Sequence, residues 1–154
     1  MNQYKKEILE HFFQTIEYVQ SLRTLTEEEW RKPIGMGKWT VAELIGHFIP
    51  WDDFVLEQRI PYILLGEDLP VGSDVKETNE RGAQVARQEA QQTTIDRYTT
   101  TRTALYQALA DVADKQWENS FTIGTRTLSF YEYCKGLAEH DQHHFKQLYD
   151  TING

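Results

Sequence analysis

Three capping boxes divide this sequence into helical segments and constrain its fold more than any other feature. In each box a threonine or serine precedes a glutamate by three residues: Thr26 with Glu29, Thr40 with Glu43, and Ser129 with Glu132. The two side chains of a capping box satisfy backbone N–H groups that a helix leaves free at its start. The sequence therefore predicts where three helices begin.

Apolar residues recur at helical spacing in four long segments, which is the pattern of helices that bury one face. The segments are residues 3–22, 40–63, 94–112 and 129–152, and a short helix follows Thr26. Pro50 and Pro61 fall inside the second segment. Because proline removes a helix hydrogen bond and clashes with the preceding turn, we expect kinks there or a boundary near Pro61.

The connections between these segments differ in length. Residues 66–87 are rich in glycine, proline and charge and are predicted to form a long crossover with one short helix near its end. Residues 119–128 alternate around a glycine and predict a small hairpin. We therefore expect one all-α domain over residues 1–154, a four-helix bundle with a long crossover between helices 2 and 3.

Charge and composition exclude several classes of protein. The formal net charge is -8, with no concentrated basic stripe, which argues against nucleic-acid and anionic-membrane partners. No apolar stretch approaches the roughly 20 residues of a membrane span, and the N-terminus lacks a signal-peptide core, so we expect a cytoplasmic protein. The single cysteine, Cys134, is expected in the core, so a metal would have to be held by His, Asp or Glu.

Two histidines are spaced as metal ligands. His140 and His144 lie four residues apart in the last predicted helix, so both imidazoles lie on one face. Two ligands make a weak site, and His47 of the second predicted helix is the best third donor. His143 is offset by about 100° from His144 and is expected at the rim. His11 has no partner pattern and is expected to be surface or core filler.

Other polar residues are candidates for catalysis without being placed by a motif. Asp52, Glu139 and Asp141 are candidate general bases near the histidines. Arg102 lies in a polar stretch of the third predicted helix. Either it faces an internal cavity, where it could anchor a carboxylate, or Thr101 faces inward and Arg102 points to solvent.

Two motifs carry a family resemblance. Residues 37–47, GKWTVAELIGH, resemble the W-[ST]-x-x-E-x-x-x-H segment of the DinB/YfiT-like superfamily, and residues 140–147, HDQHHFKQ, resemble its closing H-x-x-H-H-x-x-Q motif. The resemblance implies an up-up-down-down-type four-helix bundle with one divalent metal held by three histidines, here His47, His140 and His144. It also implies enzymes of two kinds, transferases or isomerases that use low-molecular-weight thiols, and metal-dependent hydrolases.

These observations predict a metal-dependent enzyme with one divalent ion, zinc or nickel, because three histidines leave a coordination position open for a reactant. The resemblance favours transfer of a low-molecular-weight thiol to an electrophilic small molecule, and Asp52, Asp141 and Arg102 are candidate catalytic residues. Hydrolysis stays open as an alternative, as does a stress-related protein that binds a metal or small molecule without turnover. Whether the chain forms a homodimer also stays open.

Overall fold

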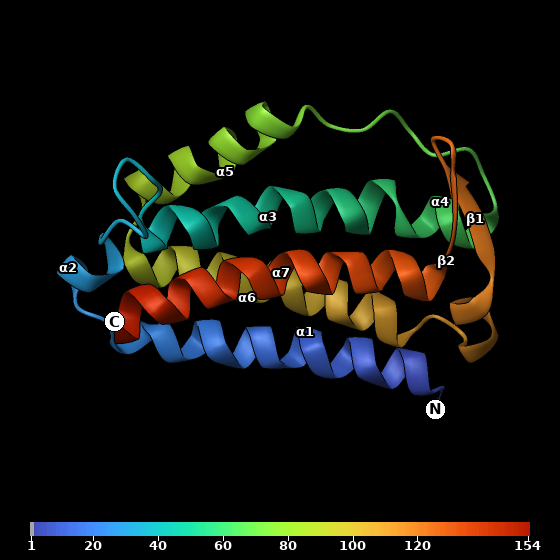
Figure 1. Cartoon of the computed structure of the whole chain (residues 1–154), viewed down its shortest axis with the longest axis horizontal. Helices are drawn as coiled ribbons and strands as arrows, with labels where there is room; N and C mark the ends of the chain where they lie inside the picture. The colour runs from blue at the N-terminus through green and yellow to red at the C-terminus, as the bar shows by residue number, and fades with distance from the viewer. Residues whose placement is uncertain (1) are drawn as a thin grey trace.

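The computed structural model describes residues 2–154 and is a four-helix bundle. Its long helices are α1 (Gln3–Ser21), α3 (Val41–Gln58), α6 (Gln91–Ala110) and α7 (Phe130–Asn153). Helices α1 and α7 run in one direction and α3 and α6 in the other (Figure 1). The order is therefore up-down-down-up, which differs from the expected up-up-down-down order because the crossover returns the chain to the end where α3 began.

The three predicted capping boxes are confirmed. Both hydrogen bonds of the box form at the start of α2 (Glu27–Trp30), of α3 and of α7. The predicted boundary near Pro61 is also confirmed, since α3 ends at Gln58 and α4 (Ile60–Leu65) follows. Pro61 lies in the first turn of α4, where a missing N–H breaks no helix bond. Pro50 stays inside α3.

The crossover differs from its prediction, because it contains a full helix, α5 (Val75–Gln88), of 14 residues. This helix packs against α3 so closely that a Cβ atom on Gly82 would lie 2.8 Å from the carbonyl oxygen of Gly46. Its buried face consists of small residues such as Gly82, Ala83 and Ala86. Small residues give a weak apolar signal, so the sequence understated this helix.

Short elements complete the chain. The predicted hairpin is confirmed as strands β1 (Ser120–Ile123) and β2 (Arg126–Ser129), which pair antiparallel. Gly124 in their turn has a φ of 60°, a conformation that glycine adopts without strain. Two 3-10 turns, η1 (Leu22–Thr24) and η2 (Asp114–Glu118), follow α1 and α6.

The core consists of two apolar clusters along the bundle. One surrounds Trp30 and Val41, and the other surrounds Trp117 and Phe130. Cys134 belongs to the second cluster, and burial raises the pKa of its thiol, so it is a packing residue as predicted. Buried charged side chains lie in the interior as well, and three of them, Asp52, Arg102 and Asp141, adjoin the site described below. Within residues 2–154, no helix has the length and apolar character that a membrane span requires.

Candidate metal centre

Three histidines converge in the middle of the bundle. His47 extends from α3, and His140 and His144 extend from successive turns of α7. One ring nitrogen from each lies within 4.8 Å of those of the other two. The ring centroids of His47 and His144 are 4.8 Å apart, and those of His140 and His144 are 4.6 Å apart. The structure thus brings together the three residues that the sequence singled out.

The start of α3 determines where His47 lies. Thr40 accepts the N–H of Glu43, while the Glu43 carboxylate accepts the N–H of Thr40 and a hydrogen bond from Arg87 of α5. The ring of Trp39, just before the cap, lies 4.9 Å from the His47 ring. The capping motif therefore places the imidazole two turns into the helix and against a fixed aromatic wall.

Neighbouring acceptors determine which nitrogens of two rings are free. His47 Nδ1 faces the carbonyl oxygen of Leu44, and His144 Nδ1 lies 2.9 Å from Oε1 of Gln147. A carbonyl oxygen can only accept, so each Nδ1 carries the proton and donates. The lone pair of each neutral ring is consequently on Nε2, the atom left for a metal.

The surroundings also keep these rings uncharged. Burial lowers the pKa of His47 to about 4, against the opposing effect of its bond to Leu44. Burial likewise lowers the pKa of His144. Both rings are therefore neutral at pH 7, which is the form that coordinates a metal.

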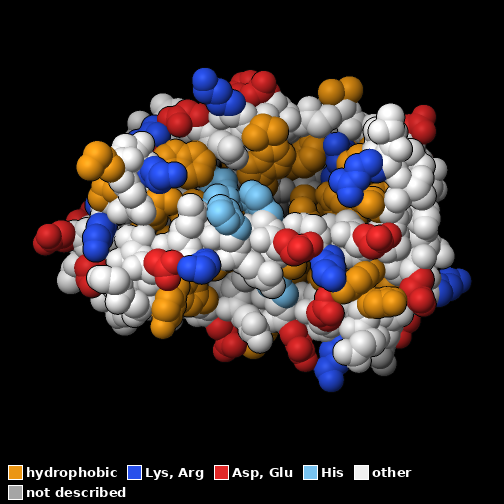
Figure 2. Space-filling view, in the orientation of Figure 1, with side chains coloured by type: hydrophobic (Ala, Val, Ile, Leu, Met, Phe, Trp, Pro, Cys, Tyr) orange, Lys and Arg blue, Asp and Glu red, His pale blue; other side chains and the backbone are white. Residues whose placement is uncertain are grey.

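This donor set fits a divalent transition metal. Imidazole nitrogen suits zinc, nickel, copper and iron, and two of the three rings present a free lone pair on a rigid helix. His47 is buried, His144 is half-buried and His140 is exposed, so solvent reaches the cluster from one side. Figure 2 shows histidine side chains gathered in a hollow at the centre of one face, between hydrophobic side chains.

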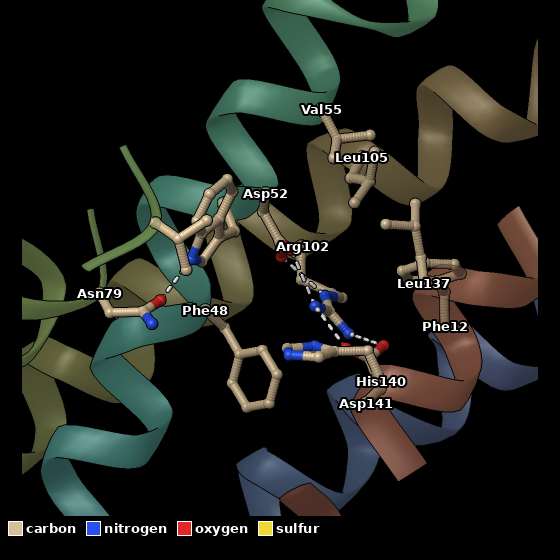
Figure 3. A pocket seen from close by; sticks show the side chains of 12 residues that line it. Phe12, Phe48, Asp52, Val55, Asn79, Arg102, Leu105, Leu137, His140 and Asp141 are labelled. Atoms are coloured by element: carbon tan, nitrogen blue, oxygen red, sulfur yellow. Dashed lines mark hydrogen bonds and ion pairs between the residues drawn. The ribbon is translucent and has the colours of Figure 1, made fainter. Parts of the chain in front are cut away.

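A cavity of about 300 Å³ adjoins the histidines and shares His140 with them. Most of the side chains that line it are aromatic or aliphatic: Phe12, Phe48, Trp51, Val55, Val75, Leu105 and Leu137. Its polar lining consists of His140, Asn79 and an ion-pair network around Arg102 (Figure 3). A small molecule beside the histidines would thus extend into a mostly apolar space.

Arg102 is buried and faces inward, which decides between the two orientations left open by the sequence. Its Nε and Nη2 atoms donate to the two carboxylate oxygens of Asp52, at 2.7 and 2.8 Å. Its Nη1 atom donates to Asp141 at 2.8 Å. His11 Nε2 lies 2.8 Å from the same oxygen of Asp141. We call these four side chains the Arg102 network.

Pairing in the network governs the charges of the candidate catalytic residues. Burial raises the pKa of Asp141, but Arg102 and His11 outweigh it and hold that pKa below its usual range. Burial raises the pKa of Asp52 despite the attraction of Arg102. Both carboxylates are already engaged by Arg102, whereas Glu139 is exposed on α7.

The sequence missed the position of His11, which is not filler but a partner of Asp141. A signal was present, because His11 and Thr15 lie one turn apart on the buried side of α1, among the apolar residues Ile8, Phe12 and Val19. Two polar residues on such a face call for a polar partner on another helix. His143 is exposed, with its ring 5.4 Å from that of His144.

Comparison with known proteins bears on the fold and the family. A family model described as the DinB superfamily matches residues 14–148. No curated protein matches the chain. Among solved structures, YfiT from Bacillus subtilis, described as a probable metal-dependent hydrolase with an unusual four-helix bundle topology, matches with a TM-score of 0.78 and 14% identity. The match covers 97% of this chain and 86% of that chain, and at this identity it shows the fold alone.

Proposed function

The chain belongs to the DinB superfamily, and from that premise we propose that it is an enzyme whose His47, His140 and His144 hold one divalent metal ion. The observation that carries the proposal is the convergence of three imidazoles beside a cavity large enough for a small molecule. Three histidine ligands leave coordination positions for a reactant, as catalytic metal sites do. Zinc and nickel are the ions we propose first.

The reaction we propose is transfer of a low-molecular-weight thiol to an electrophilic small molecule. The metal would supply acidity to a bound thiol or water. In the overall reaction an S–H bond and the bond to a leaving group break, a sulfur–carbon bond forms, and the proton departs with the leaving group. The engagement of Asp52 and Asp141 by Arg102 supports this choice, because these are the carboxylates among the described residues of the cavity wall, and neither is free to serve as a separate base.

Hydrolysis is the second candidate. It is supported by the fold shared with YfiT, which is itself described as a probable metal-dependent hydrolase. The same three histidines would serve it, with water in place of the thiol. The apolar cavity would then hold the part of an ester or amide next to the bond that is cleaved.

The metal centre is tested first by elemental analysis of the purified protein after reconstitution with zinc or nickel. We expect one equivalent per chain, and loss of at least about 100-fold in affinity in His47→Ala, His140→Ala and His144→Ala, because each change removes a ligand rather than a supporting partner. His143→Ala is the matched control on the same helix and keeps its metal. Full metal content in His140→Ala contradicts the assignment.

The reaction is tested on the reconstituted protein with 2-mercaptoethanol and 1-chloro-2,4-dinitrobenzene, in parallel with 4-nitrophenyl acetate without thiol. Thiol transfer predicts conjugate formation above the uncatalysed rate, abolished in His47→Ala. A cobalt-loaded sample should then show a sulfur-to-metal charge-transfer band when the thiol is added. Thiol-independent ester cleavage supports hydrolysis, while bound metal without turnover of any substrate in a wider panel supports a binding role.

A further inference from the structure

The cavity beside the histidines has a mostly apolar wall, to which the described part of the chain contributes no unpaired lysine or arginine. Among the described residues that line it, Arg102 is the only lysine or arginine. An anionic group on a small molecule is usually recognised by free arginine or lysine donors. Whether Arg102 has N–H donors that are not already hydrogen-bonded therefore decides whether the cavity can bind an anionic group.

Each of the five N–H groups of Arg102 already has an acceptor. Besides the bonds described above, Nη1 donates to Thr15 at 3.2 Å, and Nη2 lies 3.5 Å from the second oxygen of Asp141. Aromatic rings also lie close to the guanidinium, because its central carbon lies 4.9 Å from the ring centroid of Phe12 and 5.2 Å from that of Tyr98. A carboxylate could bind Arg102 only by displacing an aspartate.

The net charge of the network also opposes an anion. Two carboxylates, Asp52 and Asp141, face one guanidinium, so the network carries no surplus positive charge. Bringing a further anion beside them would bury it without a partner, which is costly in an apolar space. The charge balance of the wall thus favours an uncharged occupant.

Apart from His140, which belongs to the proposed metal site, one polar side chain at the cavity edge is still able to bind a ligand. Trp51 Nε1 donates to Oδ1 of Asn79 at 2.6 Å, which turns the amide so that its nitrogen remains available as a donor (Figure 3). Asn79 is half-buried on α5 and lines the cavity. An amide N–H recognises a neutral acceptor, such as a carbonyl or hydroxyl oxygen.

We infer that the cavity binds the uncharged, apolar part of the substrate, an aromatic or aliphatic group with at most a neutral hydrogen-bond acceptor, and discriminates against anionic groups. The inference rests on the proposed function in that the reactive atom lies at the three histidines while this group fills the cavity. For thiol transfer, the occupant is the electrophile, and for hydrolysis it is the apolar side of the cleaved bond. Arg102 is a structural residue of the cavity wall and not an anchor for a substrate carboxylate.

The test compares two probes of nearly the same shape, 2-naphthamide and 2-naphthoate, by calorimetric titration of the full-length protein. Titrations are made on the purified protein with its metal content measured, and again after chelation, with circular dichroism to verify the fold. We expect the neutral amide to bind the chelated protein at least about tenfold more tightly than the anion. Equal or tighter binding of naphthoate to the chelated protein overturns the inference.

Two pairs of variants locate the binding. Leu137→Trp fills the cavity and should weaken naphthamide binding by at least about tenfold, whereas Leu65→Trp, at an exposed position on α4 outside the cavity, should not. Val75→Lys adds a cation at the cavity edge and should shift the preference toward naphthoate by at least about fivefold. Val71→Lys, at an exposed position that does not line the cavity, is its control.

The outcomes separate this inference from the metal assignment. Naphthamide binding that survives Leu137→Trp, together with an amide preference that Val75→Lys leaves unchanged, places the probe elsewhere in folded proteins and overturns the inference. A protein that holds no metal but keeps the amide preference overturns the proposed function and leaves the cavity assignment standing. If the three histidines bind metal but the chelated protein prefers naphthoate, the proposed function stands and the cavity assignment is overturned.

Discussion

The histidine cluster and the Arg102 network contain similar residue types yet differ in what their polar atoms can do. The two regions meet on α7, where His140 belongs to the histidine cluster and the next residue, Asp141, belongs to the Arg102 network. Consecutive residues of a helix point about 100° apart, so one helix supplies both. In the network every donor of Arg102 has an acceptor, whereas His47 and His144 each keep a free lone pair. Saturation of hydrogen bonds distinguishes a structural cluster from a candidate binding site.

The histidine cluster and the Arg102 network also differ in the charge of their side chains. Within residues 2–154, no carboxylate accepts from the rings of His47 or His144. Their Nδ1 atoms donate to neutral oxygens, and burial lowers the pKa of both rings. In the network the opposite charges face each other, and burial does not remove the charge of Arg102. One region of the bundle thus holds neutral imidazoles and the adjoining region holds paired ions, according to the partner that each side chain meets.

The largest expected effect comes from breaking the network. Arg102→Ala leaves Asp52 and Asp141 buried without their counter-ion and should lower the free energy of unfolding by about 3–5 kcal/mol. Urea unfolding in the presence of a chelator measures it without a contribution from metal. Arg23→Ala removes an exposed pair with Asp96 and should cost less than about 1 kcal/mol. If Arg102→Ala lowered the free energy of unfolding by as little, Asp52 and Asp141 would not depend on Arg102 as their counter-ion.

The next effect concerns the pH dependence of the cluster. The folded pKa of His47, about 4, lies below the value of 6.5 for an unperturbed histidine, so the unfolded chain binds a proton more readily. The stability it contributes is full above pH 6.5 and is lost as pH falls toward about 4, a total of about 3 kcal/mol. His47→Gln should remove this part of the acid sensitivity. Unfolding of both metal-free proteins across that pH range measures how the free energy of unfolding changes with pH in each. The contribution of Asp52 is common to both proteins and cancels in the difference. If the two free energies change with pH in parallel, the prediction is contradicted.

A smaller effect tests whether His11 belongs to the network. His11→Ala removes one hydrogen-bond partner of Asp141 while Arg102 stays in place, so we expect a loss of about 1–2 kcal/mol in stability and no loss of metal. Urea unfolding and elemental analysis of the same preparation measure both. Loss of metal without loss of stability would move His11 from the network to the cluster.

The smallest effect is expected at His143, which adjoins the cluster in sequence and belongs to neither region. The side chain is exposed, so His143→Ala should change the free energy of unfolding by less than about 0.5 kcal/mol and leave metal affinity unchanged. Calorimetric metal titration is the sensitive measurement. A tenfold loss of affinity would extend the cluster to a fourth histidine.

Much of the fold was predictable because its signals are local. Thr40 and Glu43 satisfy the first turn of their own helix, and the apolar spacing of α1 needs no knowledge of its partner. The i,i+4 spacing of His140 and His144 likewise predicts a shared face. The helix α5 was underestimated because Gly82 and Ala86 contribute through close approach to α3, a property that hydrophobic spacing does not register.

The sequence by itself determined where the helices begin, which faces are apolar, and that two histidines of α7 share a face, because these depend on hydrogen bonds and spacing within one segment. Tertiary structure alone decided that Arg102 faces inward, that it pairs with Asp52 and Asp141, and that His11 meets Asp141. It also decided that no lysine or arginine among the described residues lining the cavity is left unpaired. The rotation of each helix against its neighbours sets those pairings, and a rotation of about 100°, one residue, would exchange partners.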